Sequence, residues 1–163
     1  MSGILSDNTG RASGLLKAAG GGGKVLQVVS AIDETTRSIN STTYGAFGNT
    51  MTLTLTPAAT SSKILLIAHF GFWTGTQNTK VKVYRNIGGA GATALTSRTS
   101  MKADGGNSHH PYSSAMFYDS PNTTSSCVYE LYFSASGSNA VINRGMNSGY
   151  DGIGQSIAME IGA

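Results

Sequence analysis

The sequence predicts an all-β domain of about 8–10 antiparallel strands, arranged as a β-sandwich, a jelly roll or a barrel, and preceded by a short N-terminal tail. Three observations predict this fold. Charged residues make up 12% of the 163 residues and glycine contributes 22, a mixture typical of short strands and tight turns rather than of long helices. Apolar and polar residues alternate along several short segments. Segments rich in glycine, proline, asparagine or serine separate them at fairly regular spacing.

The predicted strands are short and follow one another closely. In chain order they are Lys24–Ala31, Arg37–Asn40, Met51–Thr56, Lys63–Trp73, Lys80–Arg85, Ala94–Arg98, Tyr112–Asp119, Ser126–Ala135, Val141–Arg144 and Ser156–Ile161. A glycine-rich turn is expected over Asn86–Ala92, and longer polar loops over Met101–Pro111 and Asn147–Gly154. The sequence contains no internal repeat of fixed period.

Strict alternation identifies the side chains that face the core. In Met51–Thr56 every second residue is apolar, which places Met51, Leu53 and Leu55 on the core face and the threonines on the other face. Pro57 then ends the strand. By the same pattern Val81 and Val83 are expected to point inward. Near the end of the chain the alternating apolar residues are Ile157, Met159 and Ile161.

The segment Lys63–Trp73, which reads KILLIAHFGFW, is apolar on both faces. One row contains Ile64, Leu66, Ala68, Phe70 and Phe72, and the other contains Leu65, Ile67, His69 and Trp73. In a two-sheet sandwich only one of these rows meets the core, so something else must cover the second row. A neighbouring subunit is the simplest candidate, and the second row is therefore the predicted subunit interface. His69 is interpreted as a core or interface histidine rather than a catalytic base.

The sequence divides into three parts. Residues 1–19 are short and weakly apolar, four glycines at 20–23 form a predicted hinge, and residues 24–163 form the β domain. Two interpretations of residues 1–19 stay open: a disordered terminus, or an anchor peptide that docks on a larger assembly. In the second interpretation the docking residues are Ile4, Leu5, Arg11, Leu15 and Leu16. The sequence starts without a secretory-signal pattern, and no apolar run reaches the roughly 20 residues of a membrane span.

Charge and cysteine content narrow the function. The net charge is +3, and the cations are dispersed, with Lys80 and Lys82 among the closest pairs. Because a nucleic-acid-binding protein usually carries a dense basic stripe, no nucleic-acid partner is predicted. Cys127 is the only cysteine, so no intrachain disulfide can form, and its strand-like surroundings predict a buried, inert thiol.

The residues predict neither an enzyme nor a cofactor or metal site. None of the patterns HxH, HExxH and CxxC occurs, and the adjacent His109 and His110 would point to opposite sides of an extended chain. A metal held in that loop with Asp104 or Asp119 stays a minor alternative. A glycosidase needs two carboxylates facing each other across a cleft.

The candidate glycosidase pair is Glu130 with Asp119 or Glu160. Because strand residues flank each of these acids, a surface or ion-paired role is the favoured interpretation.

Two polar segments could bind a ligand. One surrounds His109, His110 and Tyr112, and the other contains Asn143 and Arg144 with Tyr150 further along. Each combines an aromatic ring with amides or charges, as saccharide-binding surfaces do. These residues are the candidate receptor contacts, with a host-surface glycan as one possible ligand.

Several stretches, taken in order, resemble a known family. They are KVLQVV at 24–29, LTLTPAATSSKILLIAHFGF at 53–72, VYRN at 83–86, YDSPNTTSSCVYELYF at 118–133, VINR at 141–144 and SIAMEIGA at 156–163. These stretches, with the opening MSGILSDNTGRASGLLKA, resemble C-terminal domains of tail-fibre-like bacteriophage virion proteins, which are frequent in marine phages. The DSPNTTSS, INR and AMEI elements are the most specific.

The resemblance implies a trimeric jelly roll, similar in build to the TNF and C1q heads, in a virion. The expected function is that of a short tail fibre or spike component that docks on other virion proteins by its N-terminus and recognises the host surface. A long fibre is not expected, because the sequence has only the glycine hinge in place of a shaft. The alternatives are a capsid decoration or cement protein, or a head fibre, without a receptor role, and more remotely a glycan depolymerase that uses Glu130.

Overall fold

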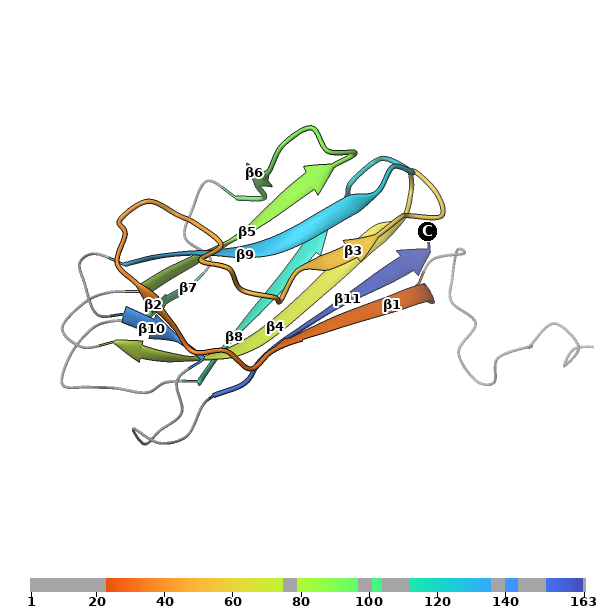
Figure 1. Cartoon of the computed structure of the whole chain (residues 1–163). Coiled ribbons are helices and arrows are strands. Elements are labelled where there is room, and N and C mark those ends of the chain that lie inside the picture. Colours follow the sequence, from red (N-terminus) through yellow and green to blue (C-terminus); the bar gives the residue numbers. More distant parts are fainter. Residues whose placement is uncertain are drawn as a thin grey trace, which may run out of the picture.

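The computed structural model describes residues 23–74, 79–96, 101–103, 112–135, 140–143 and 152–162. Within these ranges the chain forms eleven β-strands and no helix (Figure 1). The strands are β1 (Lys24–Asp33), β2 (Arg37–Ile39), β3 (Leu53–Leu55), β4 (Lys63–Thr74), β5 (Thr79–Ile87), β6 (Thr93–Ala94), β7 (Met101–Ala103), β8 (Tyr112–Asp119), β9 (Cys127–Ala135), β10 (Ala140–Ile142) and β11 (Gly154–Gly162).

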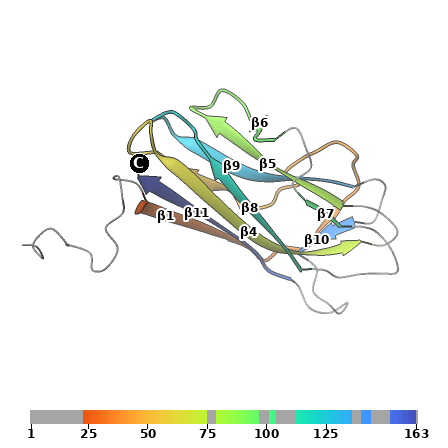
Figure 2. The ribbon, with the colours of Figure 1, turned by 180° about the vertical axis from the view of Figure 1, so that it is seen from behind.

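The strands form two antiparallel sheets. The larger sheet has six strands. Five follow the order β1-β11-β4-β10-β2, and the sixth, β8, pairs with β4 on the edge opposite β11. Figure 2 shows β1, β11, β4 and β8 lying side by side. The smaller sheet has five strands, in the order β3-β9-β5-β6, with β7 also on β5. Since β9 pairs with β5 over its whole length, β6 and β7 share the opposite edge of β5.

The strand order is that of a jelly roll. If β6 and β7 are taken as one interrupted strand, and the short additions β2 and β10 are set aside, eight principal strands remain. Numbered along the chain, they run 1-8-3-6 in one sheet and 2-7-4-5 in the other. This interleaving of early and late strands is the pattern of two Greek keys wound together, so the predicted fold class is confirmed.

The core lies between the two sheets. Phe70 of β4 and Phe133 of β9 are fully buried, and their rings meet edge to face with centroids 5.5 Å apart. The predicted inward residues of Met51–Leu55 and of β5 are buried in the same cluster, since Met51, Leu53, Leu55, Val81 and Val83 are each at most 4% exposed. Alternation along the sequence therefore identified the core face of these segments correctly.

Some elements differ from the sequence prediction. The described residues form eleven strands rather than eight to ten, because β7 is added to the ten predicted segments. Met101–Ala103, expected to begin a polar loop, is a strand because it pairs in register with Thr79–Val81 of β5. The strand expected over Ala94–Arg98 is instead the two-residue β6, and the chain is described only as far as Thr96 in that region.

The glycine hinge ends at an ordered residue. Gly23 has a φ of +104°, which suits glycine, and its amide donates a hydrogen bond of 2.9 Å to the carbonyl of Gly162. This bond continues the pairing of β1 with β11 by one residue before Lys24. Residues 1–22 and 163 lie outside the described residues.

Candidate functional site

The sandwich has two distinct ends. At one end, which we call the tether end, Lys24 at the start of β1 pairs with Gly162 at the end of β11. At the opposite end, the loop end, Asp33 pairs with Gly154 and Gly71 pairs with Tyr112. The twelve residues of β4 span roughly 40 Å between the two ends, at ~3.3 Å per residue.

The outer face of the six-stranded sheet carries three rows of side chains across β1, β11, β4 and β8. Directly paired residues of an antiparallel sheet point to the same face, so the register gives each row. The rows, starting at the tether end, are Val28-Met159-Leu65-Tyr118, Ser30-Ile157-Ile67-Met116 and Ile32-Gln155-His69-Ser114. The first two rows are apolar except for Ser30.

We call the apolar members of these two rows the apolar zone. They are Val28, Leu65, Ile67, Met116, Tyr118, Ile157 and Met159. Met116 is 72% exposed and Tyr118 is 64% exposed, although both are large apolar side chains on a regular strand. The others are exposed or half-buried.

Exposed apolar surface is concentrated on this sheet. Nine large hydrophobic side chains are exposed among the described residues. All nine belong to β1, β8 or β11 or to Ile153 immediately before β11, and the described part of the five-stranded sheet contributes none. A contiguous exposed apolar patch on a small domain marks a surface that contacts another molecule.

The outer face of the five-stranded sheet is different in character. The rings of Tyr84 and Tyr132 stack there with centroids 4.1 Å apart, and the ammonium group of Lys82 lies 4.8 Å from the ring centroid of Tyr44. Polar and charged side chains therefore alternate with the aromatic rings on this face. The apolar zone has no counterpart among its described residues.

The four predicted interface residues of β4 do not all belong to the apolar zone. Leu65 and Ile67 are half-buried members of the apolar zone, as their place in the second row of the strand predicted. His69 is exposed, so a core role for it was wrong. The backbone of Trp73 belongs to β4, where it pairs with Val141 of β10, and its side chain lies outside the described residues.

His69 belongs to a polar cluster at the loop end of the same face. Its ring lies parallel to that of Tyr112, with an interplanar angle of 3° and centroids 5.5 Å apart. The Nδ1 atom of His69 is 2.9 Å from the hydroxyl oxygen of Ser114. With Gln155 and Ile153, the two rings line an open depression of about 350 Å³.

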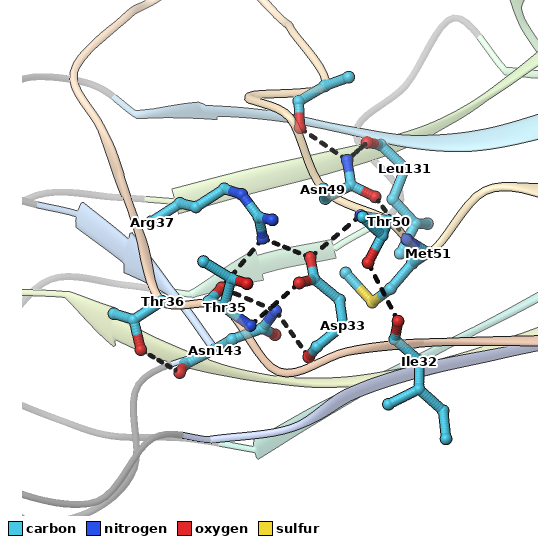
Figure 3. A network of polar contacts seen from close by, with 11 residues as sticks. Ile32, Asp33, Thr35, Thr36, Arg37, Asn49, Thr50, Met51, Leu131 and Asn143 are labelled. Atoms are coloured by element: carbon cyan, nitrogen blue, oxygen red, sulfur yellow. Dashed lines mark hydrogen bonds and ion pairs between the residues drawn. The ribbon is translucent and has the colours of Figure 1, made fainter.

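A second polar network lies inside the loop end (Figure 3). The carboxylate of Asp33, which is 1% exposed, forms an ion pair with Arg37 and accepts hydrogen bonds from the backbone amides of Thr35 and Thr50. Burial acts to raise the pKa of Asp33, but Arg37 and the two amides outweigh it and hold the pKa below its ordinary value of 3.8. The network thereby fixes the turn between β1 and β2.

Asn143 is part of this network and is fully buried. Its side-chain amide donates to the backbone carbonyls of Asp33 and Thr35, and its φ of +56° turns the chain after β10. A receptor cannot reach this side chain, so the prediction of Asn143 as a receptor contact is corrected. Little in the sequence indicates that Asn143 is buried, because Asp33 and Thr35, whose carbonyls it binds, lie more than 100 positions away.

The carboxylates considered for a glycosidase lie in separate places. Asp119 pairs with Arg85 at 2.7 Å and accepts a hydrogen bond from the Tyr129 hydroxyl between the sheets. Glu130 follows Tyr129 on β9 and so points to the outer face of the five-stranded sheet. The ion-paired role favoured for Asp119 is confirmed, and Asp119 and Glu130 do not face each other.

Glu160 is buried, against the expectation of a surface or ion-paired role. It is 1% exposed, and its carboxylate accepts hydrogen bonds from the Gln27 side chain at 2.6 Å and the Ala58 amide at 2.7 Å. Burial acts to raise the pKa of Glu160, but the polar groups of Ser62, Gln27 and Ala58 lower it below its ordinary value. The carboxylate joins β11 to β1 and to the segment before β4.

The structure describes only part of the predicted site. Tyr112 is 49% exposed at the start of β8, as a ligand contact requires. The docking residues Ile4, Leu5, Arg11, Leu15 and Leu16, together with His109, His110, Arg144 and Tyr150, lie outside the described residues. Cys127 is a buried free thiol, as predicted.

The described residues lack two kinds of feature. They contain no group of three or more His, Cys, Asp or Glu residues arranged to hold a metal ion. They also contain no helix long and apolar enough to cross a membrane.

The fold defines the class of this protein: a jelly-roll β-sandwich, here with exposed apolar side chains on the outer face of its larger sheet. The sequence matches no protein-family profile. It also matches no curated protein. Among solved structures, the chain is similar to chains in the structures of infectious bursal disease virus Gt strain and Gx strain and of the T13 IBDV viral particle.

These similarities concern the fold alone, because the sequences are only 13–14% identical. The TM-scores are 0.46, 0.41 and 0.44, in the order Gt, Gx and T13. The matches cover 83%, 83% and 86% of this chain. They cover 39%, 38% and 38% of those chains, so this chain spans about two fifths of their length.

Proposed function

We propose that this protein is a structural component of a bacteriophage virion, a short tail fibre or spike subunit. Residues 1–19 dock it on other virion proteins, and the β domain projects and recognises the host surface. Three copies associate through the outer face of the six-stranded sheet. The resemblance of the sequence to tail-fibre-like virion proteins supports the virion setting and the number of copies.

The observation that carries the proposal is the apolar zone. A monomer would leave Met116 and Tyr118 largely in water, at a cost of about 25 cal/mol per Å² of apolar surface. Neighbouring copies in the trimer that covered this zone would recover that free energy. The two rows run across four strands, so the zone extends over the width of the sheet face formed by β1, β11, β4 and β8.

The two ends of the sandwich support separate roles for docking and for host recognition. Residue 23, which follows the docking segment, is bonded at the tether end. Tyr112 lies at the loop end, as do Ala103 and Asn143, the described neighbours of the other candidate receptor residues. A chain anchored at residues 1–19 would therefore direct its recognition surface away from the particle.

Light scattering of the purified full chain at micromolar concentration tests the assembly. We expect the mass of three chains. Met116→Glu and Ile157→Glu each place a charge in the apolar zone and should shift the mass toward one chain, because burying an unpaired carboxylate is costly.

Val128→Glu is the matched control, since Val128 points outward on the five-stranded sheet. It should leave the mass unchanged. A single-chain mass for the unsubstituted protein, or equal dissociation by all three variants, would contradict the proposed interface.

A further inference from the structure

We propose that the polar cluster formed by His69, Tyr112, Ser114 and Gln155 is a binding subsite for a neutral saccharide. The inference rests on the proposed function and deepens it, because it gives the host-recognition surface a ligand class and a position. That position is the loop end of the six-stranded sheet, on regular strands.

The strand register brings the cluster together. His69 on β4 lies directly between Gln155 on β11 and Ser114 on β8, so the three side chains stand side by side on one face. Tyr112 lies opposite Gly71, which has no side chain. The Tyr112 ring therefore has room to lean across β4 and stack on the ring of His69.

The cluster is held in place before any ligand arrives. The parallel rings of His69 and Tyr112 restrict each other, and the contact between Nδ1 of His69 and the Ser114 hydroxyl fixes the imidazole. His69 lies on β4, and Tyr112 lies on β8, which pairs with β4 from Ile64 to Gly71. Such preorganisation lowers the entropy lost when a ligand binds.

The chemistry of the depression matches a neutral sugar. Two aromatic rings and Ile153 offer apolar surface to the C–H groups of a pyranose, and Gln155, His69 and the Tyr112 hydroxyl offer hydrogen bonds to its hydroxyl groups. The volume of about 350 Å³ falls within the range of small-molecule sites, roughly 300–1,000 Å³. No Lys, Arg, Asp or Glu is among its described lining residues, which favours an uncharged ligand.

The same chemistry separates this site from the apolar zone. A neighbouring subunit that covered the third row with apolar groups would bury the Gln155 amide and the Nε2 atom of His69 without hydrogen-bond partners, and a buried unsatisfied polar group is costly. We therefore expect the subunit interface to end at the second row. The third row stays open to a hydroxyl-rich ligand.

An oligosaccharide array probed with the full chain tests this site, followed by titration of the best neutral oligosaccharide by calorimetry. Neutral hexose or N-acetylhexosamine oligosaccharides should bind. Tyr112→Ala should weaken that binding about tenfold or more, because the stacking surface is lost, and Tyr112→Phe should retain most of it.

Tyr118→Ala is the matched control, since Tyr118 is an exposed tyrosine on the same strand and face but belongs to the apolar zone. Tyr118→Ala should weaken self-association, measured by light scattering, and leave the affinity for saccharide unchanged. Tyr112→Ala should weaken saccharide binding and leave self-association unchanged. This contrast separates failure of the subsite from failure of the proposed interface.

Three outcomes would overturn the inference. One is the absence of any neutral oligosaccharide bound at millimolar concentration. Another is binding of acidic oligosaccharides only. The third is dissociation of the oligomer by Tyr112→Ala, which would make the cluster part of the subunit contact.

Discussion

At the scale of single residues, Asp33 connects the strands at the loop end through its ion pair and two amide contacts. Because its pKa is lower in the folded protein than in the unfolded chain, its contribution to stability is present above about pH 4 and is lost as the pH falls through the folded pKa. Asp33→Asn should lower the free energy of unfolding at pH 7 by about 3 kcal/mol. The variant should also lose less stability than the unsubstituted protein when the pH falls from neutral to acidic. Denaturant unfolding across this pH range measures both effects.

Glu34 provides the control for Asp33, because it is the adjacent carboxylate and is exposed. Glu34→Gln should change neither the stability nor its pH dependence appreciably. Equal effects of the two substitutions would show that the buried network contributes nothing specific.

At the scale of elements, β11 begins at a point of close approach. A Cβ atom on Gly154 would lie 2.5 Å from Sδ of Met51 and 2.7 Å from Oδ1 of Asn143, both in buried residues. Gly154→Ala should therefore destabilise the protein by about 1–3 kcal/mol, as overpacking of a core does, and lower its melting temperature. Gly45→Ala, where the nearest atom is 3.4 Å away, should have a much smaller effect in the same thermal scan.

At the scale of the whole molecule, the two ends should separate attachment from recognition. Deletion of residues 1–19 should abolish binding to virions that lack this protein, measured by co-sedimentation, while the β domain keeps its cooperative unfolding. Substitution of His109, His110 and Tyr112 should leave co-sedimentation intact and reduce adsorption to host cells. Adsorption that is insensitive to those substitutions would instead favour a cement protein without a receptor role.

Much of the fold could be predicted from the sequence because strand pleating is local. The face of each residue in Met51–Leu55 and Lys80–Arg85 follows from a period of two, and the doubly apolar β4 predicted the apolar outer row at Leu65 and Ile67. The rest depends on distant partners. β7 exists because of its register on β5, and the burial of Glu160 depends on Gln27 and Ala58.

The predicted site shows the same limit. Tyr112 could be predicted from its aromatic and polar surroundings, but its stacking on His69 depends on the pairing of β4 with β8. Asn143 looked identical to a loop ligand because its buried partners are remote in sequence.

The position of β11 has a consequence for how the molecule folds. This strand follows all the others in the sequence, yet it lies between β1 and β4 and joins the earliest strand to the rest of its sheet. Contacts between such distant residues form slowly, because a long stretch of chain must be ordered before they add stability. During synthesis β1 therefore lacks its partner strand until β11 leaves the ribosome, and an unpaired strand edge exposes a nascent chain to aggregation.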